Sequence, residues 1–381
     1  MRTSTLGTVA FAVFSAAGPV FSRAGHRTLR RQDDMNPFNG KKLFVNPSYA
    51  AKLEKTLESF EAAGDTVNAE KTRAIQDIGT FVWISDIASL SNIDTVIEDA
   101  RAAQAETGET VVGLVLYNLP DRDCSAGESA GELILSEDGL KRYKTEYILP
   151  YAEKVSAAKD LTFAIVLEPD SLGNLVTNMN VEKCANAADA YKEGIAYAIS
   201  SLQFENVHLY IDAAHGGWLG WDDNLQPTAQ VFGDVVRQAG NSSRIRGYAT
   251  NVSNYNPFKA NIPEPYTEYS NSADESNYTI SLSPYLEAEG LPTRFIIDQG
   301  RVALPGARAE WGEWCNVAPA GYGIKPGTVV DNNLVDSIVW IKPGGESDGQ
   351  CGMAGAPRAG QWFDKYVQML VENADASISL S

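Results

Sequence analysis

Seven short runs of residues that are apolar throughout constrain the fold of this chain more than any other feature of its sequence. They lie at 80–84, 111–117, 161–167, 207–211, 245–249, 294–297 and 337–340. A strand that is apolar on both faces is buried on both faces, which is typical of parallel sheets. Amphipathic segments with helical spacing, such as 92–104, 138–159 and 185–202, lie between the runs. This alternation predicts an α/β fold, either a barrel or a doubly wound sheet.

Polar side chains that can take part in chemistry follow nearly every run. They are Asp86, Asp121, Asp123, Glu168, Asp170, Asp212, His215, Asn251, Asn254, Asp298, Gln299, Arg301 and Lys342. A barrel builds its active site from the C-terminal ends of several strands. An open sheet instead concentrates its chemistry at one switch point with a glycine-rich phosphate loop, and no Gly-x-Gly-x-x-Gly follows the first run. The sequence therefore favours a barrel.

The first 31 residues have the features of a segment that is removed on export. Arg2 precedes an apolar run at 6–14, and small residues follow at 15–17, which is the order of a secretory signal peptide. Arg30-Arg31 resembles the end of a short pro-segment with a dibasic cleavage site. The apolar run is too short to span a bilayer. We therefore expect a secreted, extracellular protein that begins near residue 32.

Charge and cysteine content restrict the classes of molecule that this chain is expected to bind. The chain has 31 Lys and Arg against 49 Asp and Glu, and residues 1–31 contain five of those arginines and no acid. A protein with this excess of acidic residues repels nucleic acid and anionic membranes, and neither is an expected partner. A neutral substrate is favoured. Four cysteines in an exported chain predict two disulfides with three possible pairings. No Cys-x-x-Cys pair is present, and only two histidines follow residue 31, so no metal is expected.

Three glycosylation sequons occur, at Asn241, Asn251 and Asn277. They fit a secreted eukaryotic protein, although Asn251 lies beside a predicted strand end, where burial is expected.

Two kinds of hydrolytic chemistry compete. Gly127-Glu-Ser129-Ala-Gly131 has the letters of a nucleophile elbow, and His215 follows it. However, the preceding strand ends at Tyr117, and a polar loop containing a cysteine intervenes, so the strand-to-helix context of an elbow is missing. Carboxylates at strand ends are plentiful instead. Glycoside hydrolysis needs only an acid of raised pKa and a second carboxylate, and it is therefore favoured.

Tryptophans support this choice. Trp83, Trp218, Trp221 and Trp314 lie beside acidic or glycine-rich loops. A flat apolar face with one donor edge suits a sugar ring, and core packing is the alternative role for each indole. Trp340 and Trp362 are expected in the core, within a strand and a helix.

Five motifs resemble those of glycoside hydrolase family 6 cellulases. They are Tyr117-Asn-Leu-Pro-Asp-Arg-Asp-Cys124, Leu167-Glu-Pro-Asp-Ser-Leu172, Asp212-Ala-Ala-His-Gly-Gly-Trp-Leu-Gly-Trp221, Trp311-Gly-Glu-Trp-Cys315 and Trp340-Ile-Lys-Pro-Gly-Gly-Glu-Ser-Asp348. They run in the family's order from about residue 36 to 374. The resemblance implies a distorted seven-stranded (β/α) barrel, similar to a TIM barrel, that hydrolyses β-1,4-glucan with inversion and without a cofactor. Residues 32–381 would form one catalytic domain without a separate cellulose-binding module, and a monomer is expected.

The resemblance also implies catalytic roles. Asp170 would be the general acid, with its pKa raised by burial and a neighbouring carboxylate. Asp123 would be that neighbour and would receive a proton through a water that Ser129 helps to hold. Arg122 would orient the carboxylates, and Tyr117 would crowd and distort the sugar at the cleavage point. Asp212 would support the electrostatics.

Further residues are implied around the substrate. Asp348, with Lys342 and Glu346, would bind the sugar before the scissile bond, and Asp348 is also a candidate base; no single base is assigned. Trp83 and Trp314 would stack glucose on the non-reducing side of the cut. Trp218 and Trp221 would do so on the other, leaving-group side, with His215 and Asn254 as hydrogen-bonding partners. Ser85 is a further expected substrate-binding residue. The implied disulfides are Cys124–Cys184 and Cys315–Cys351, each restraining an active-site loop. Asp298 and Gln299 are expected to be structural.

One departure from the family pattern concerns the mode of cleavage. Members that act on chain ends carry a long insertion after the Glu-x-Asp segment, whereas 346–362 is compact here, and Ser347 stands where those members often have cysteine. A short loop predicts an open cleft and cleavage within chains. The alternatives are a cellobiohydrolase acting at non-reducing ends and a carbohydrate-binding barrel without catalysis. A metal site at the acidic clusters is disfavoured because an arginine lies between Asp121 and Asp123.

Overall fold

The computed structural model describes residues 1, 35–240, 242–261 and 263–378, and one compact unit begins at Asn36. Apart from Met1, the expected signal peptide and pro-segment lie outside the described residues, as does the sequon at Asn241. None of the helices in the described part of the chain is both long enough and apolar enough to cross a membrane.

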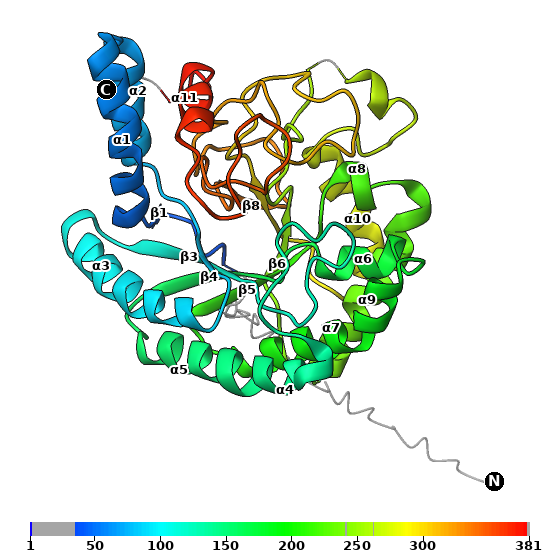
Figure 1. Cartoon of the computed structure of the whole chain (residues 1–381). Helices are drawn as coiled ribbons and strands as arrows, with labels where there is room; N and C mark the ends of the chain where they lie inside the picture. Colours follow the sequence, from blue (N-terminus) through cyan, green and yellow to red (C-terminus); the bar gives the residue numbers. More distant parts are fainter. Residues whose placement is uncertain (2–34, 241, 262, 379–381) are drawn as a thin grey trace. The chain divides into compact units, whose positions relative to one another are not determined.

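One curled, all-parallel sheet occupies the centre of the unit (Figure 1). Its strands are β1 (Lys42–Leu43), β2 (Val82–Ile84), β3 (Thr110–Leu116), β4 (Thr162–Leu167), β5 (Val207–Asp212), β6 (Gly247–Thr250), β7 (Phe295–Asp298) and β8 (Val335–Val339). The order is β1-β3-β4-β5-β6-β7-β8, and β2 also pairs with β3. The predicted α/β fold with a distorted barrel is therefore confirmed. All seven predicted strands are present, and the two-residue β1 is the one that sequence reasoning missed.

The distortion lies where the barrel would close. β1 pairs with the start of β3 and β2 with its end, so two short strands share one edge. Near the top, Phe81 N donates to the Trp340 carbonyl at 3.0 Å, and Trp83 Nε1 donates to the Ile341 carbonyl at 2.8 Å. Below, a cavity of about 650 Å³ lies between β1 and β8. The barrel is thus bridged by two bonds near its mouth and remains open below.

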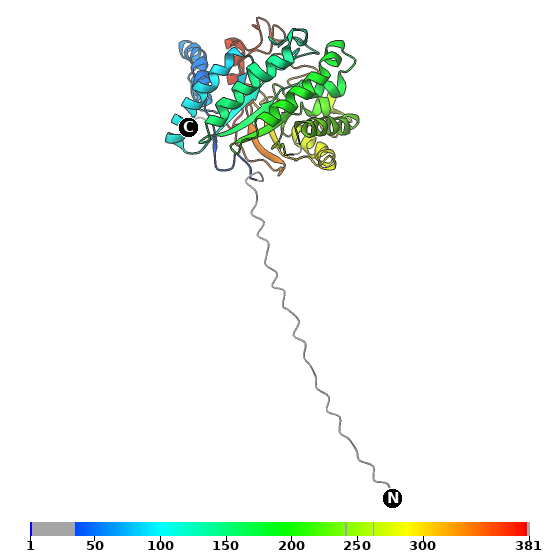
Figure 2. The ribbon, with the colours of Figure 1, turned by 90° about the horizontal axis from the view of Figure 1, so that it is seen from below.

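Most helices cover the outer face of the sheet in an arc, whereas those at 47–63, 66–76 and 364–372 pack against one another in a separate cluster (Figures 1 and 2). The helices are α1 (Pro47–Ala63), α2 (Thr66–Gln76), α3 (Ser91–Thr107), α4 (Gly139–Arg142), the π-helix η4 (Tyr143–Ile148), α5 (Leu149–Ala157), α6 (Ser171–Thr177), α7 (Glu182–Ser201), α8 (Gly216–Leu219), α9 (Asp222–Ala239), α10 (Glu275–Ala288) and α11 (Asp364–Glu372). Short 3-10 turns are η2 (Ala88–Leu90), η3 (Leu135–Glu137) and η5 (Pro265–Thr267). The helices expected at 92–104, 138–159 and 185–202 correspond to α3, to α4–η4–α5 and to α7.

The helical position expected for Trp362 is wrong. Trp362 precedes α11 and forms an antiparallel bridge with Glu346. Backbone bonds between the two ends of the 346–362 segment, such as Ser347 N–H to the Gln361 carbonyl at 2.9 Å, hold it there. Its indole is only partly buried. Trp340, at the end of β8, is fully buried as expected.

The alternation of side chains along β3 determines which residues face the barrel interior. On β3, Val112, Leu114 and Leu116 pack toward the helices, whereas Val111 and Val115 face the barrel interior. Successive side chains of a strand alternate between faces, so Tyr117 points inward above Val115 at the barrel mouth.

The sequon at Asn251 is fully buried, as expected, and its Nδ2 donates to the carbonyls of Asn256 and Asp298. Asn277 lies on the exposed face of α10.

Candidate active site

Strained backbone marks the C-terminal ends of the strands. Asp121, Asp123, Glu168, Asp170 and Asn251 all adopt positive φ, between 48° and 63°. A non-glycine residue in this conformation costs on the order of 1 kcal/mol, and such residues cluster at functional sites. The loops that carry the predicted acids are therefore held in specific, unfavourable conformations by their surroundings.

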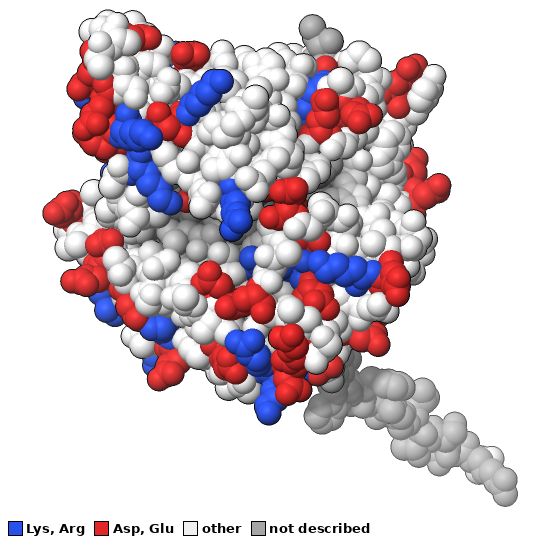
Figure 3. Space-filling model, viewed as in Figure 1, with Lys and Arg blue, Asp and Glu red and all other residues white. Residues whose placement is uncertain are grey.

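A cavity of about 420 Å³ opens above these strand ends. The predicted residues that line it are Asp123, Ser129, Asp170, His215, Trp218, Asn254 and Trp314. The space-filling view shows this face hollowed near its centre (Figure 3). Charged, amide and aromatic side chains from the loops that follow β3, β4, β5, β6 and β7 thus share one concave site.

Asp170 lies immediately before α6, and two bonds fix its backbone. Its N–H donates to Asp212 Oδ2 at 3.0 Å, and its carbonyl accepts from Asn174 Nδ2 at 2.5 Å. Asp170 is exposed to solvent on the cavity side, and the protein walls of the cavity bury its carboxyl group from the other sides. This burial, together with the charges of Asp123 and Asp348, raises the pKa of Asp170 to about 7. A carboxyl group with this pKa holds a proton in mildly acidic solution and can act as an acid.

Asp123 is held by Ser129. The backbone N–H of Ser129 donates to Asp123 Oδ2 at 2.7 Å, and its hydroxyl does so at 3.1 Å. The same hydroxyl lies 2.8 Å from the Tyr117 hydroxyl. The disulfide Cys124–Cys184 ties this loop to α7, as expected. Tyr117, Ser129 and Asp123 therefore form a continuous polar chain.

The hydrogen bonds of Arg122 go to backbone carbonyls, and its charge acts against the burial that raises the pKa of the Glu168 carboxyl. Its guanidinium donates to the carbonyls of Tyr117, Ser85 and Ser129, the last at 2.8 Å, and stacks over the Tyr117 ring at 4.3 Å. The expectation that Arg122 orients the carboxylates stays a prediction, and these bonds show a route by which it can do so through the loop backbone. Arg122 secures the loop on which Asp123 and Ser129 lie.

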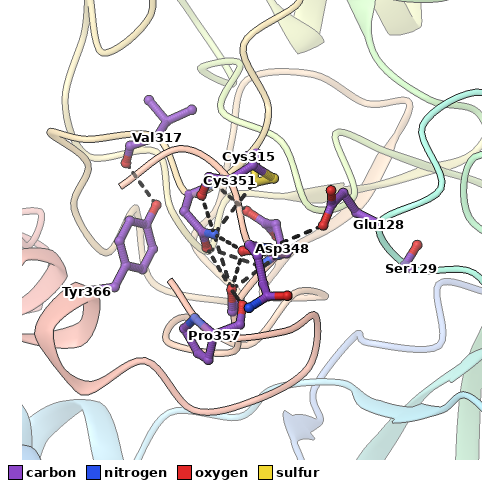
Figure 4. The surroundings of a disulfide bond; sticks show 12 residues. Glu128, Ser129, Cys315, Val317, Asp348, Cys351, Pro357 and Tyr366 are labelled. Carbon is purple, nitrogen blue, oxygen red and sulfur yellow. Dashed lines mark hydrogen bonds between the residues drawn. A yellow bond between two sulfur atoms is a disulfide. The ribbon is translucent and has the colours of Figure 1, made fainter. Parts of the chain in front are cut away.

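Asp348 is a buried carboxylate with strong partners. Its Oδ2 accepts from Arg301 Nη1 at 2.6 Å and from the Asn316 N–H at 2.9 Å, and Lys342 Nζ is 3.5 Å from Oδ1. Burial alone would raise the pKa of Asp348, but Arg301 and Lys342 outweigh it and hold that pKa below its ordinary value. The implied disulfide Cys315–Cys351 is present beside it (Figure 4).

Two further buried acids brace the strand ends. Glu168 accepts from the N–H groups of Asn118 and Leu119 and from the Tyr143 hydroxyl at 2.8 Å, and burial raises its pKa to about 7. Asp212 accepts from the N–H groups of Asp170 and Ala214, and burial followed by the Asp170 charge raises its pKa. Both therefore position the Asp123 and Asp170 loops.

Several predicted residues surround the cavity without lining it. Trp83 packs edge-on against Tyr117, with Lys342 Nζ 5.7 Å from its ring, and Ser85 accepts from Arg122 through its carbonyl. Trp221 packs edge-on against Trp311. Glu346 pairs with Lys52 of α1 at 2.7 Å, so its carboxylate is already engaged away from the cavity. Asp298 accepts from four backbone N–H groups, which fits the structural role expected of it.

The wall residues and partners that sequence reasoning missed include three with clear contacts. Trp311 and Asn178 line the cavity, and Arg301 is the main partner of Asp348. Trp311 stands in a motif in which Trp314 alone received a role, and Arg301 follows a strand end directly. Only the position of the buried Asp348 shows what Arg301 does. In the described part of the chain, no group of three or more His, Cys, Asp or Glu is arranged to hold a metal.

Two loops meet across one side of the site. Glu128 Oε2 accepts from the Gln350 N–H at 3.2 Å, which joins the Ser129 loop to the Asp348 loop (Figure 4). Gly349 lies so close to Glu128 that a Cβ there would be 2.5 Å from Glu128 Oε2. A side chain at residue 349 would separate the loops.

The raised pKa of Asp170 predicts an alkaline limit to activity. An acid that donates its proton in the reaction must start protonated, so kcat/KM should fall about tenfold per pH unit above about pH 7. Initial rates on a soluble glucan across this range would measure the limit. Because the Asp123 charge contributes to the shift, Asp123→Asn should move the limit of the residual activity to lower pH. An unchanged limit would contradict this assignment.

Comparison with known proteins adds to this geometry. The sequence model for glycosyl hydrolases family 6 matches residues 38–374. A 1,4-beta-D-glucan cellobiohydrolase CEL6B of Podospora anserina is 61% identical over 91% of this chain and 84% of its own length. Endoglucanase-6B of Humicola insolens is 56% identical over 90% of this chain and 99% of its own length. The solved structure of endoglucanase CEL6B from Humicola insolens superposes with a TM-score of 0.89, covering 91% of this chain and all of that one, at 55% identity.

Proposed function

This chain belongs to glycosyl hydrolases family 6, and we propose that it is an inverting endo-β-1,4-glucanase that cleaves cellulose and related β-glucans within their chains. One observation carries the proposal. Asp170, with its pKa raised to about 7, faces a tryptophan-walled cavity together with Asp123. An acid of raised pKa beside a second carboxylate is the requirement for glycoside hydrolysis.

Asp170 protonates the glycosidic oxygen as the bond to the leaving sugar breaks. Inversion requires a water on the opposite face of the ring, whose proton must be accepted as the water attacks. Asp123 accepts that proton through the Ser129 hydroxyl and an intervening water, since Ser129 already bonds Asp123 and Tyr117. Tyr117 presses on the ring at the cleavage point from the barrel mouth.

Asp348 is assigned electrostatic support rather than the part of base. A base must take up a proton, and Arg301 and Lys342 hold the pKa of Asp348 below its ordinary value. Its charge lies close enough to raise the pKa of Asp170, and it stabilises positive charge that develops on the sugar ring in the transition state.

Compact folding of the 346–362 segment supports cleavage within chains. Ser347 Oγ donates to the carbonyls of Gly349 and Pro357, and Ser347 N–H donates to the Gln361 carbonyl, so the segment folds back on itself. Endoglucanase-6B, which matches over almost its whole length, supports the same mode. The Glu128–Gln350 contact and the similarity to a cellobiohydrolase favour the second candidate, which is release of cellobiose from non-reducing ends.

Viscosity distinguishes the two modes. An enzyme that cuts within chains should reduce the viscosity of a soluble cellulose derivative steeply while few reducing ends have formed, because each internal cut halves a chain. Viscosity and reducing sugar would be followed in the same digestion. Nearly constant viscosity while cellobiose accumulates would refute the endo mode and favour the second candidate.

Secretion is part of the proposal. Two disulfides close loops of 60 and 36 residues, and disulfides persist mainly in oxidising, extracellular compartments. The protein would act outside the cell as a monomer on β-1,4-glucan chains.

A further inference from the structure

A buried polar network below the cavity has no part in the chemistry described above. Its members are Glu275 of α10, Asn256 and Arg308. Glu275 and Asn256 are fully buried, and Arg308 is 5% exposed. They lie directly beneath His215 and Asn254, two of the residues that line the cavity.

The orientation of the Asn256 amide is fixed from both sides. Arg308 Nη2 donates to Asn256 Oδ1, and Asn256 Nδ2 donates to Glu275 Oε1 at 2.6 Å. A flipped amide would place its oxygen against the Glu275 oxygen and its NH2 against the guanidinium, so that two buried bonds would be lost. One hydrogen of Nδ2 therefore remains for His215 Nδ1, which lies 3.2 Å away.

This orientation sets the tautomer of His215. Burial, with the charge of Arg308, lowers the pKa of His215 to about 3, so the ring is neutral. A neutral ring that accepts at Nδ1 carries its proton on Nε2. The nitrogen left for the cavity is then a donor.

The same arginine orients Asn254. Arg308 Nη1 donates to Asn254 Oδ1 at 2.8 Å, and the Tyr255 N–H donates to that oxygen as well. Because the amide oxygen is occupied, the NH2 group of Asn254 is left for the cavity. His215, whose ring lies between those of Trp218 and Trp311, and Asn254 thereby both present donors to the cavity.

We propose that Glu275, Asn256 and Arg308 are positioning residues that fix His215 and Asn254 as hydrogen-bond donors to the hydroxyl oxygens of the leaving-side glucose unit. The inference rests on the proposed function for the identity of the sugar, but the tautomer follows from the network alone. Sugar hydroxyls can donate or accept, so two fixed donors select how the protons of the hydroxyls that they contact are directed.

Nitrogen-15 NMR of the labelled full chain tests the tautomer directly. Long-range proton–nitrogen spectra should show His215 protonated on Nε2 from mildly acidic to neutral pH, with assignment from a His215→Gln variant. Asn256→Asp places a carboxylate where the amide NH2 donated, so His215 should move its proton to Nδ1. Signals of His208 on β5 should not change. A wild-type His215 with its proton on Nδ1 overturns the proposal without any variant.

Kinetics test the positioning role. Asn256→Asp should raise KM for soluble cello-oligosaccharides about fivefold, the loss of one hydrogen bond of about 1 kcal/mol, while kcat changes less. Glu275→Gln keeps the accepting oxygen and should preserve both the tautomer and KM.

If Asn256→Asp does not fold, Arg308→Lys replaces it, because an ammonium does not reproduce the planar fork that holds both amide oxygens. Arg308→Lys should raise KM by a similar factor. A changed tautomer with unchanged KM overturns the role. Correct tautomers in a protein that does not cleave β-1,4-glucan would instead refute the proposed function alone.

Discussion

Replacing Asp170 with asparagine should lower kcat on unactivated β-1,4-glucan by about 10³-fold, within the range that general acid catalysis contributes. Asparagine keeps the size and polarity of the side chain but cannot donate a proton to the glycosidic oxygen. The backbone bonds of residue 170 with Asp212 and Asn174 do not involve the carboxyl group, so the fold should be retained. Initial rates and a thermal melt of the same preparation would measure both effects.

The leaving group supplies the control for this prediction. Asp170→Asn should lose much less of its kcat on a substrate whose leaving group departs without protonation, such as a dinitrophenyl glycoside. No acid is needed for that reaction. Asp331→Asn, an exposed aspartate before β8, should retain full activity on both substrates. Equal losses of Asp170→Asn on activated and unactivated substrates would mean that residue 170 acts by another route. An Asp170→Asn protein that cleaved glucan at the full rate would remove the assignment.

The fold could be predicted largely from hydrophobic pattern because a parallel sheet buried on both faces leaves an unusually clear signal. Each of the seven runs singled out in the sequence became a strand. β1 was not predicted because its two residues, Lys42 and Leu43, are too few to show a periodicity. Their pairing depends on the part of the β3 edge that β2 leaves free. The position of Trp362 was misjudged for a related reason, since its bridge to Glu346 is a tertiary contact.

The candidate site was predictable in its residues and less so in their partners. A carboxylate after a strand can be seen in the sequence, whereas the group that sets its charge comes from elsewhere in the chain. Asp348 depends on Arg301, which lies 47 positions away. The sequence also does not show that Arg122 donates to backbone carbonyls of three segments, those of Ser85, Tyr117 and Ser129. Such pairings arise from how the loops pack, and local sequence carries little of that information.

Arg301→Met should destabilise the protein by about 3–5 kcal/mol, the cost of leaving one partner of a buried ion pair uncompensated. The side chains of Arg301 and Asp348 are only 1% and 5% exposed. Methionine fills similar volume but leaves Asp348 with Lys342 at 3.5 Å and the Asn316 N–H. Denaturant unfolding, or thermal melting if unfolding is irreversible, would measure the loss.

The pH dependence of this loss has a definite sign. In the native protein the pKa of Asp348 is depressed, so its charge stabilises the fold above the ordinary pKa of aspartate, and this stability is lost as the pH falls through the folded pKa. Without Arg301, burial raises the pKa of Asp348, and its ionisation then opposes folding as the pH rises. The difference in stability between the native protein and the variant should therefore be larger at about pH 7 than at about pH 4.

The exposed pair Arg101–Asp160, with side chains 48% and 50% exposed, supplies the matched control. Arg101→Met should cost under about 1 kcal/mol, because water and salt screen an exposed pair. If Arg301→Met and Arg101→Met lost equally little stability, the Arg301–Asp348 pair would not be what holds Asp348 ionised beside Asp170.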